Sequence, residues 1–109
     1  MFIYKRCDCA ANKIKPTIPQ PKLNTLAGLL KLASVPARLN ILLLLNDAPH
    51  CVCDIITHTK MSQTLASHHL SDLVKANLVK SQKNGQFVDY SLTKKGNALV
   101  SHLEKLTAI

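Results

Sequence analysis

The chain has 109 residues, which is enough for one domain with a single hydrophobic core. Hydrophobic residues make up 47% of it, which excludes a disordered chain, and aromatic residues only 4%, so we expect an aliphatic core of Leu, Ile, Val and Ala. The net charge of +8 favours a polyanionic partner, most simply nucleic acid, although a charge that only maintains solubility would look the same.

The four cysteines form two closely spaced pairs, Cys7 with Cys9 and Cys51 with Cys53. The amino-terminal residues lack the long apolar run of a signal peptide, and the longest apolar run, residues 41–45, is far too short to cross a bilayer. We therefore expect a protein of the reducing cytoplasm without a membrane segment. Paired cysteines there bind metals or carry out redox chemistry more often than they form disulfides.

Residues 1–21 are expected to form a mobile tail that carries the first cysteine pair. Pro16, Pro19 and Pro21 break helices, and several basic residues keep the segment solvated. Residues 22–109 would then form the folded domain.

Three helices are predicted in the first half of this domain. Residues 23–33 have one apolar face, and residues 36–45 follow a Ser34 cap and are apolar nearly all round, which predicts burial. A short third helix is expected to begin near Cys53 or Asp54 and to end around Thr59, before a turn at Lys60 and Met61. The inner cysteine pair therefore falls at the start of a helix.

A fourth helix is predicted over residues 62–76, with its apolar and polar side chains on separate faces. Residues 78–83 and 87–92 then read as two strands around an Asn84-Gly85 turn, and Thr93 can cap a last helix to about residue 106. This order of four helices, a hairpin and a helix (ααααββα) predicts a winged helix-turn-helix, a mainly α fold with a β-hairpin wing.

The fourth helix and the hairpin carry the side chains that we expect to contact DNA. In a helix-turn-helix the second helix lies in the major groove and the first braces it. Gln63 can pair with an adenine edge, whereas His69, four residues from Leu65 and from Leu73, is expected to be packed and hydrogen-bonded. The alternative is a solvated amphipathic helix beside an ordinary hairpin. The predicted DNA-binding residues are Lys60, Ser62, Gln63, Thr64, Ser67, His68, Ser71, Lys80, Lys83 and Gln86.

The apolar faces of the first and last predicted helices favour contact with a second copy of the chain. A single module reads only a few base pairs, and helix-turn-helix proteins commonly dimerise on palindromic sites. We therefore expect an isologous homodimer on double-stranded operator DNA. The alternative is that both faces only close the core of one chain.

Four segments of the chain resemble motifs of the ArsR/SmtB metalloregulators. Residues 34–42 (SVPARLNIL) resemble the signature that opens a helix in that family, and residues 51–54 (CVCD) resemble its metal box. Residues 62–70 (SQTLASHHL) and 84–92 (NGQFVDYSL) are similar to its recognition helix and its wing. The resemblance covers residues 23–106 and implies a homodimeric repressor that holds its operator without metal and releases it when metal binds.

The cysteines are closest to those of the thiolate-rich, CadC-like branch of this family. Box cysteines of one protomer meet tail cysteines of the other there, so the resemblance implies a metal site of Cys7, Cys9, Cys51 and Cys53. Cadmium, lead and zinc favour such a sulfur shell, and arsenite could take three of the four sulfurs. His50 is an additional candidate ligand.

Some members of the family have a second site, which binds zinc near the last helix. Half of the ligands of that site are present in this sequence. Asp89 and His102 match two of its ligands, but Ser91 and Lys105 stand where the resemblance would require His and Glu. We therefore expect Asp89 to be a wing residue and His102 to be an interface residue.

The start of a helix should lower the pKa of the thiols of Cys51 and Cys53 and so favour metal binding. Metal would then tie the tail of one protomer to the third helix of the other and displace the fourth. Two alternatives stay open: a thiol redox or persulfide sensor on the same fold, and a constitutive DNA-binding protein with a structural zinc. An enzyme is not expected, since the sequence shows neither a phosphate-cradling glycine-rich loop nor an evident catalytic carboxylate pair.

Overall fold

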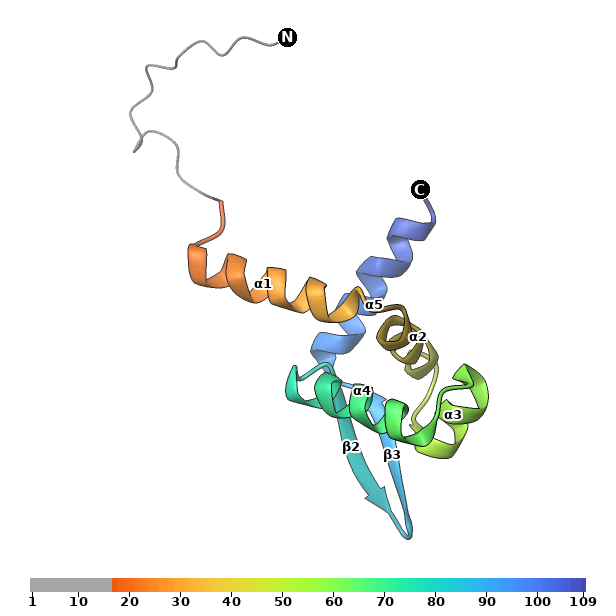
Figure 1. The fold of residues 1–109 in the computed structure, drawn as a ribbon. Helices are drawn as coiled ribbons and strands as arrows, with labels where there is room; N and C mark the ends of the chain where they lie inside the picture. The colour runs from red at the N-terminus through yellow and green to blue at the C-terminus, as the bar shows by residue number, and fades with distance from the viewer. Residues whose placement is uncertain (1–16) are drawn as a thin grey trace, which may run out of the picture.

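The computed structural model describes residues 17–109, so the predicted tail ligands Cys7 and Cys9 lie outside the described residues. The order of elements confirms the predicted mainly α fold with a hairpin wing, and adds one short strand. Figure 1 shows the wing projecting from the end of the molecule opposite the C-terminus. The elements are α1 (Gln20–Ala33), α2 (Pro36–Leu45), β1 (His50–Cys51), α3 (Val52–Thr59), α4 (Gln63–Lys75), β2 (Val79–Asn84), β3 (Phe87–Leu92) and α5 (Lys94–Thr107).

The core is aliphatic, as the composition predicts, and it lies where α2, α4, α5 and the inner ends of the strands meet. Burying these side chains removes apolar surface from water, at about 25 cal/mol per Å², and this term holds the helices together. Tyr90 and Leu99 are among the half-buried side chains that pack around it. The buried residues are Ala33, Ile41, Leu42, Leu45, Ile55, Ala66, Leu70, Leu73, Leu78, Val79, Leu92 and Val100.

The first helix begins earlier than the sequence predicts. It starts at Gln20, inside the segment assigned to the tail, and Pro19 precedes it while Pro21 lies in its first turn. A proline there is compatible with a helix, because the first backbone N–H groups have no partner within the helix and the fixed φ of proline is already helical. The prediction that Pro21 breaks any helix was therefore wrong.

The cap of α2 also differs from the prediction. Val35 is the N-cap and its side chain makes no capping bond, whereas the Ser34 hydroxyl donates back to the Lys31 carbonyl oxygen at 2.8 Å. The predicted cap of α5 is confirmed, because the Thr93 side chain accepts from the Gly96 N–H. Ser62, where the fourth helix was predicted to begin, is the N-cap of α4, and its side chain accepts from the Leu65 N–H.

Strand β1 was not predicted. It pairs antiparallel with β3, with His50 opposite Tyr90 and Cys51 opposite Asp89, so that the sheet has the order β1-β3-β2. The hairpin itself turns at Gly85 and Gln86, one residue later than expected, because Asn84 still pairs with Phe87. Gly85 has a φ of 65°, a conformation that favours glycine.

Among residues 17–109 no single helix is long and apolar enough to cross a membrane, although α1 and α2 together, bent by 91°, match the length and composition of a broken span. The apolar side chains of Ile41, Leu42 and Leu45 in α2 are instead buried in the core.

Helix α5 approaches the start of β2 very closely at Gly96. A Cβ atom added there would lie 2.1 Å from the Leu78 carbonyl oxygen and 3.2 Å from Leu92 Cδ2. The same backbone region is fixed by Thr93, whose N–H donates to the Leu78 carbonyl oxygen and whose hydroxyl donates to the Asn77 carbonyl oxygen. Only glycine therefore allows α5 to leave the sheet at this angle.

We expect Gly96→Ala to lower the free energy of unfolding by about 1–3 kcal/mol or more, because the methyl group must displace backbone. Gly28→Ala is the matched control, since a Cβ at Gly28 meets no atom within 4 Å and alanine suits a helix interior better than glycine. Urea unfolding followed by circular dichroism measures both. Equal stability of the two variants would contradict the close approach of α5.

Candidate nucleic-acid interface and thiol pair

Helices α3 and α4 form the helix-turn-helix. Helix α3 ends where Lys60 adopts a left-handed conformation (φ 61°), with its N–H donating to the Ile56 carbonyl oxygen at 2.8 Å. Helix α4 then begins behind its Ser62 cap, where the Leu65 N–H donates to the hydroxyl at 3.1 Å. These local bonds set the angle between the two helices, and α4 is anchored in the core by Ala66, Leu70 and Leu73.

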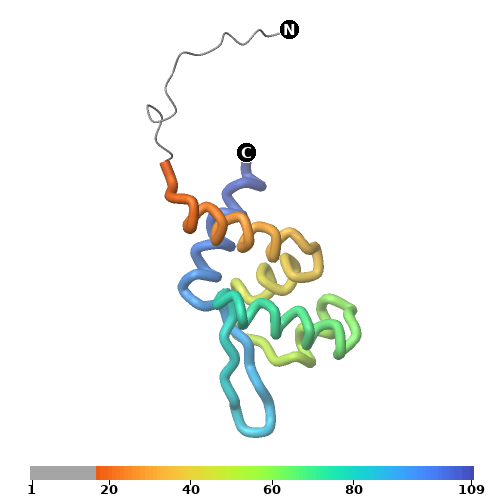
Figure 2. The backbone as a smooth tube through the Cα atoms, turned by 60° about the vertical axis from the view of Figure 1, so that its left-hand side comes forward, coloured from red at the N-terminus to blue at the C-terminus, as the bar shows by residue number. Residues whose placement is uncertain are grey.

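All ten residues predicted to bind DNA are exposed, whereas His69 between them is buried, as expected. The wing continues from the end of α4, and Figures 1 and 2 both place it beyond α4, away from the C-terminus. Exposed polar side chains of α4 and lysines of β2 thus belong to neighbouring elements at one end of the molecule. Two of these side chains also have partners within the chain: Ser62 caps α4, and His68 Nε2 lies 3.7 Å from Asp72 Oδ2.

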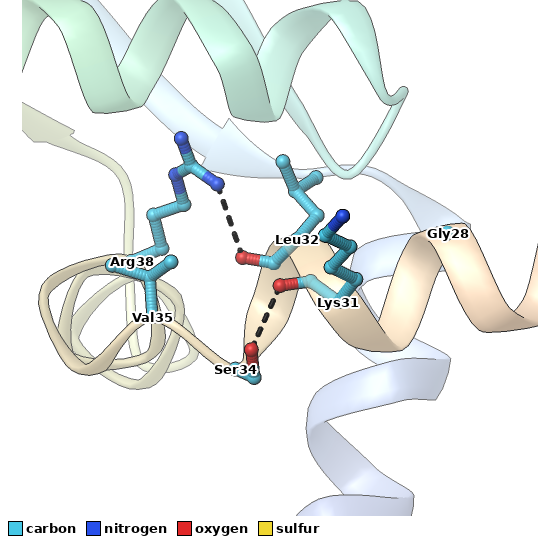
Figure 3. A pocket seen from close by; sticks show the side chains of 6 residues that line it. All are labelled: Gly28, Lys31, Leu32, Ser34, Val35 and Arg38. Carbon is cyan, nitrogen blue, oxygen red and sulfur yellow. Dashed lines mark hydrogen bonds between the residues drawn. The ribbon is translucent and has the colours of Figure 1, made fainter.

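Arg38 of α2 joins α1, α2 and α4. Its Nη2 donates to Asp72 Oδ2 at 2.6 Å and its Nε donates to His69 Nδ1 at 3.1 Å, both on α4. Its Nη1 donates to the Leu32 carbonyl oxygen near the end of α1 at 3.4 Å. Figure 3 shows this last bond at the edge of a hollow of about 430 Å³ between α1 and α2. One guanidinium therefore fixes the position of α4 relative to the first two helices.

His69 is held as a neutral acceptor at this joint. Burial lowers its pKa below the usual value, and the Arg38 guanidinium lowers it further. Since Nδ1 accepts from Arg38, the proton of the neutral ring is on Nε2. Protonation of Nδ1 would remove that acceptor and place a second positive charge beside Arg38.

The inner cysteines lie at the junction of β1 and α3. Cys51 is the last residue of β1 and the N-cap of α3, in an extended conformation (φ −83°, ψ 169°), and Cys53 follows in the first turn. Cys51 is half-buried, Cys53 is exposed, and neither is in a disulfide. The change from strand to helix between them leaves the two thiols close enough for Cys51 to raise the pKa of Cys53. Cys53 is therefore not a buried core residue.

The expected lowering of thiol pKa was wrong for Cys53. Hydrogen bonding to Cys51 and repulsion by the charge of that neighbour raise the pKa of Cys53. Two neighbouring thiols cannot both ionise easily in the absence of a cation, and this opposes the effect of the helix start. A positive ion between the sulfurs would remove the repulsion.

The other candidate ligands do not complete a metal site with this pair among the described residues. His50 Nδ1 is 3.3 Å from Asp54 Oδ2, and Asp89 accepts from Asn84 Nδ2 at 3.2 Å in the wing. His102 is exposed on α5. Among residues 17–109 the structure assembles no group of three or more Cys, His, Asp or Glu side chains that could hold a metal. Cys51 and Cys53 are neighbouring soft donors, so they fit two positions of a thiolate shell.

Two features of the site were missed in the sequence. Strand β1 has only two residues, too few for an alternation signal. Arg38 and Asp72 were not recognised as partners, because they are 34 residues apart. The only available signal was Arg38, the single charged residue in the mainly apolar helix α2. A charged side chain usually requires a partner when it is buried.

The sequence is similar to that of a known protein family and to those of several bacterial regulators. Residues 35–81 match the family described as "Bacterial regulatory protein, arsR family". The arsenical resistance operon repressor of Staphylococcus xylosus is 43% identical over 67 residues, which are 62% of this chain and 64% of that repressor, so the match spans less than two thirds of it. The cadmium resistance transcriptional regulatory protein CadC of Listeria innocua is 34% identical over 80 residues, covering 72% of this chain and 67% of CadC.

Solved structures share the fold. HlyU from Vibrio cholerae superposes with a TM-score of 0.76 at 28% identity, over 84% of this chain and 100% of HlyU. A homodimeric winged helix-turn-helix DNA-binding domain from Mycobacterium bovis superposes with a TM-score of 0.70 at 28% identity, over 86% of this chain and 90% of that domain. These comparisons confirm the predicted fold.

The His69 environment predicts a pH dependence of stability. Its folded pKa is lowered, so the unfolded chain binds a proton first as the pH falls below about 6.5. Stability is therefore complete above about pH 6.5 and is lost as the pH falls toward the folded pKa. His69→Asn keeps an acceptor for Arg38 but cannot be protonated, so its free energy of unfolding should fall less between pH 7.5 and 5.5.

The control for this measurement is His102→Asn, which changes an exposed histidine on α5. It should retain the pH dependence of the wild type. Urea unfolding at the two pH values gives all three differences, and an equal decrease in wild type and His69→Asn would contradict the assignment to His69.

Proposed function

The chain belongs to the ArsR family of bacterial regulatory proteins, and we propose that it represses transcription as a homodimer on operator DNA and is released when a soft metal ion binds its cysteine thiolates. The observation that carries the proposal is the position of the thiol pair at the junction of β1 and α3. From there α3 packs on α4, which carries the exposed polar face, and β1 pairs with β3 of the wing. Repression of a metal resistance operon, as part of this proposal, agrees with the names of the matched relatives, and a cytoplasmic location follows from that role.

The DNA-binding part of the proposal rests on charge and exposure. The chain has a net charge of +8, and Lys60, Lys80 and Lys83 are exposed around the polar face of α4. Lysines at phosphates supply affinity that falls steeply with salt, and Gln63, Thr64 and Ser67 on α4 would meet base edges. The binding is expected to be strongest at low ionic strength.

The sensing part of the proposal uses Cys51 and Cys53 with Cys7 and Cys9. A soft cation such as cadmium, lead or zinc would supply a positive charge that stabilises the thiolates, and arsenite remains a candidate because it needs only three sulfurs. Cys51 and Cys53 lie on a segment that contacts both DNA-reading elements, so a change in their position is passed to α4 through α3 and to the wing through β3. A coupling of about 1–3 kcal/mol is usual for such switches and would change operator affinity about 5- to 150-fold.

The homodimer is supported by apolar surface that the single chain leaves exposed. Leu23, Leu26 and Leu30 of α1 are exposed, as is Leu106 of α5. A hollow of about 390 Å³ between α2 and α5 is lined mainly by leucines. The alternative that these faces only close the core holds in part, since Ala33 and Val100 are buried. The M. bovis neighbour with the same fold is homodimeric.

We expect Cys51→Ser to bind operator like the wild type but to lose its release by cadmium, because one of the two adjacent sulfur ligands is removed. The operator is a duplex selected from a random library by the reduced, metal-free wild type. Fluorescence anisotropy measures its binding while ultraviolet absorption follows formation of thiolate–metal bonds.

Three controls separate the alternatives to this prediction. His102→Ala should keep the metal response, and its loss would place the sensing site on α5 instead. Release of the metal-free wild type by peroxide or persulfide in the presence of chelator would favour a redox sensor. If Cys51→Ser still dissociates on addition of cadmium, the assignment of the thiol site is wrong.

Leu26→Glu is expected to convert the dimer to a monomer, because the interface would bury a carboxylate without a partner. Leu65→Glu is the matched control, since Leu26 and Leu65 are 42% and 45% exposed but Leu65 lies on α4. Sedimentation velocity gives the mass of each variant. A dimeric Leu26→Glu protein would show that α1 is not in the interface.

A further inference from the structure

The hollow between the end of α1 and the start of α2 is separate from the thiol pair and from the residues proposed to contact DNA. Its volume is about 430 Å³, which lies within the usual range of pockets for small ligands. A hollow of this size holds a small organic molecule. The residues that line it are Gly28, Lys31, Leu32, Ser34, Val35 and Arg38.

The lining of this hollow combines apolar surface with positive charge. Leu32 and Val35 are half-buried there, while Lys31 and Arg38 contribute an ammonium and a guanidinium group. Figure 3 shows the side chains of Lys31, Leu32 and Arg38 extending to the same side of the joint between the helices. Among the described residues, those that line the hollow include no carboxylate. The hollow therefore complements an anion that also has an apolar part.

Arg38 keeps N–H groups for a further partner. A guanidinium carries five N–H donors, and three of those of Arg38 have partners among the described residues, namely His69, Asp72 and the Leu32 carbonyl oxygen. The bond to Leu32 is the longest of the three, at 3.4 Å, and lies at the edge of the hollow. Because a guanidinium can donate two parallel N–H bonds to one carboxylate, this side of Arg38 suits a carboxylate ligand.

Gly28 widens the hollow at a position where the fold does not require glycine. It is an interior residue of α1, where glycine is less favourable than alanine. A Cβ atom added to Gly28 meets no atom within 4 Å, in contrast to one added to Gly96. Neither a close approach nor a positive φ therefore explains this glycine. The space that it leaves beside α1 is part of the hollow.

We propose that this hollow binds a small carboxylic acid with an apolar body. The carboxylate accepts hydrogen bonds from Arg38 and is balanced by the ammonium group of Lys31. The apolar body lies against Leu32 and Val35, in the space beside Gly28. This site goes beyond the proposed function, since it uses neither the cysteines nor the exposed face of α4, and it gives the chain an input that is separate from metal.

The bound acid acts on α4 through Arg38. The guanidinium that holds the acid also donates to Asp72 and His69, and these bonds fix α4 relative to α2. A second carboxylate beside Arg38 competes with Asp72 for the same positive charge, so α4 is held less firmly. The consequence for DNA rests on the proposed function: the acid is expected to weaken operator binding about fivefold or more.

Other occupants match this hollow less well. The exposed leucines proposed for the dimer, Leu23, Leu26 and Leu30, lie by helical spacing on the face of α1 roughly opposite to Gly28. Residues 1–16 contain four basic residues and one acid, so their net charge has the same sign as that of the hollow. A DNA phosphate has no apolar part to match the lining.

The first test adds phenylacetate or hexanoate to the reduced, metal-free protein, with phenylacetamide and hexanamide as the neutral counterparts. In proton–nitrogen correlation NMR spectra the two acids should shift the signals of residues 28–38, including the Nε–H of Arg38, and the shifts should saturate at one ligand per chain. The amides should leave these signals in place. The proposal is overturned if no saturable shift occurs in this segment, or if acids and amides bind equally well.

The second test changes the hollow without removing a bond of Arg38. Gly28→Leu fills the space and suits a helix better than glycine, so this variant should fold and lose the binding of phenylacetate. Lys31→Gln should weaken that binding about two- to fivefold, as expected for an exposed ion pair. Lys22→Gln is the matched control, because Lys22 is exposed on the same helix but outside the hollow.

Two results of this test contradict the site. If Gly28→Leu binds phenylacetate like the wild type, the ligand is bound elsewhere. If Gly28→Leu becomes a monomer in sedimentation velocity, the hollow belongs to the dimer interface instead.

The third test measures the effect of the acid on DNA binding by fluorescence anisotropy with the selected duplex. Saturating phenylacetate should weaken duplex binding by the wild type but not by Gly28→Leu, with sodium chloride at equal ionic strength as the control. If the wild type binds no duplex, the proposed function fails, while the NMR result still decides the carboxylate site. If the duplex binds equally well with and without the acid, the action through Arg38 is overturned. If no acid binds and Lys31→Gln makes duplex binding less dependent on salt, the cations contact DNA phosphates and the proposal fails.

Discussion

The orientation of the DNA-reading helix depends on one half-buried guanidinium. Arg38 donates to two side chains of α4 and to a carbonyl oxygen of α1, so three helices share its charge. Hydrogen bonds to charged groups typically contribute about 1.5–3 kcal/mol each. The side chains of Arg38 and Asp72 are 16% and 25% exposed, so solvent partly screens this pair. Its contribution is therefore expected toward the lower end of that energy range. The bonds of Arg38 matter mainly because they are directional. Apolar packing alone would let α4 slide over its neighbours, whereas the bonds from Arg38 to Asp72 and to His69 define how α4 is rotated about its axis and how closely it packs on α2.

The segment of residues 50–59 is the second structural link. It contacts the wing through β1 and the reading helix through α3, and the thiol pair lies at the residue where strand becomes helix. A ligand there acts on a point where the backbone already changes conformation, which costs less than distortion in the middle of an element. The two DNA-reading elements therefore depend on the same short segment, and neither can be displaced at its base without affecting the contacts of the other.

The sequence predicted what local chemistry determines. The cap at Thr93 and the start of the fourth helix at Ser62 were identified from side-chain type and position, and the apolar face of α4 from its period. Prediction from the sequence failed where an element depends on a residue far away in the chain. Strand β1 forms because β3, about 40 residues later, offers it an edge to pair with. The raised pKa of Cys53 could not be predicted either, because it depends on how close the folded backbone brings the thiol of Cys51. Cys7 and Cys9 stay a prediction, since they lie outside the described residues.

The fold and the sensing site are largely independent in this chain. The buried aliphatic residues form one continuous core around α2, α4 and α5, and neither Cys51 nor Cys53 belongs to it. A structural zinc normally takes the place of a core that is too small, and its ligands are then buried beneath the elements that they join. Here Cys53 is exposed and Cys51 half-buried at the edge of the sheet, so an ion bound to them would add to a domain that already has its core. A site of this kind suits reversible occupation, in which binding shifts the balance between two folded arrangements rather than between folded and unfolded chains.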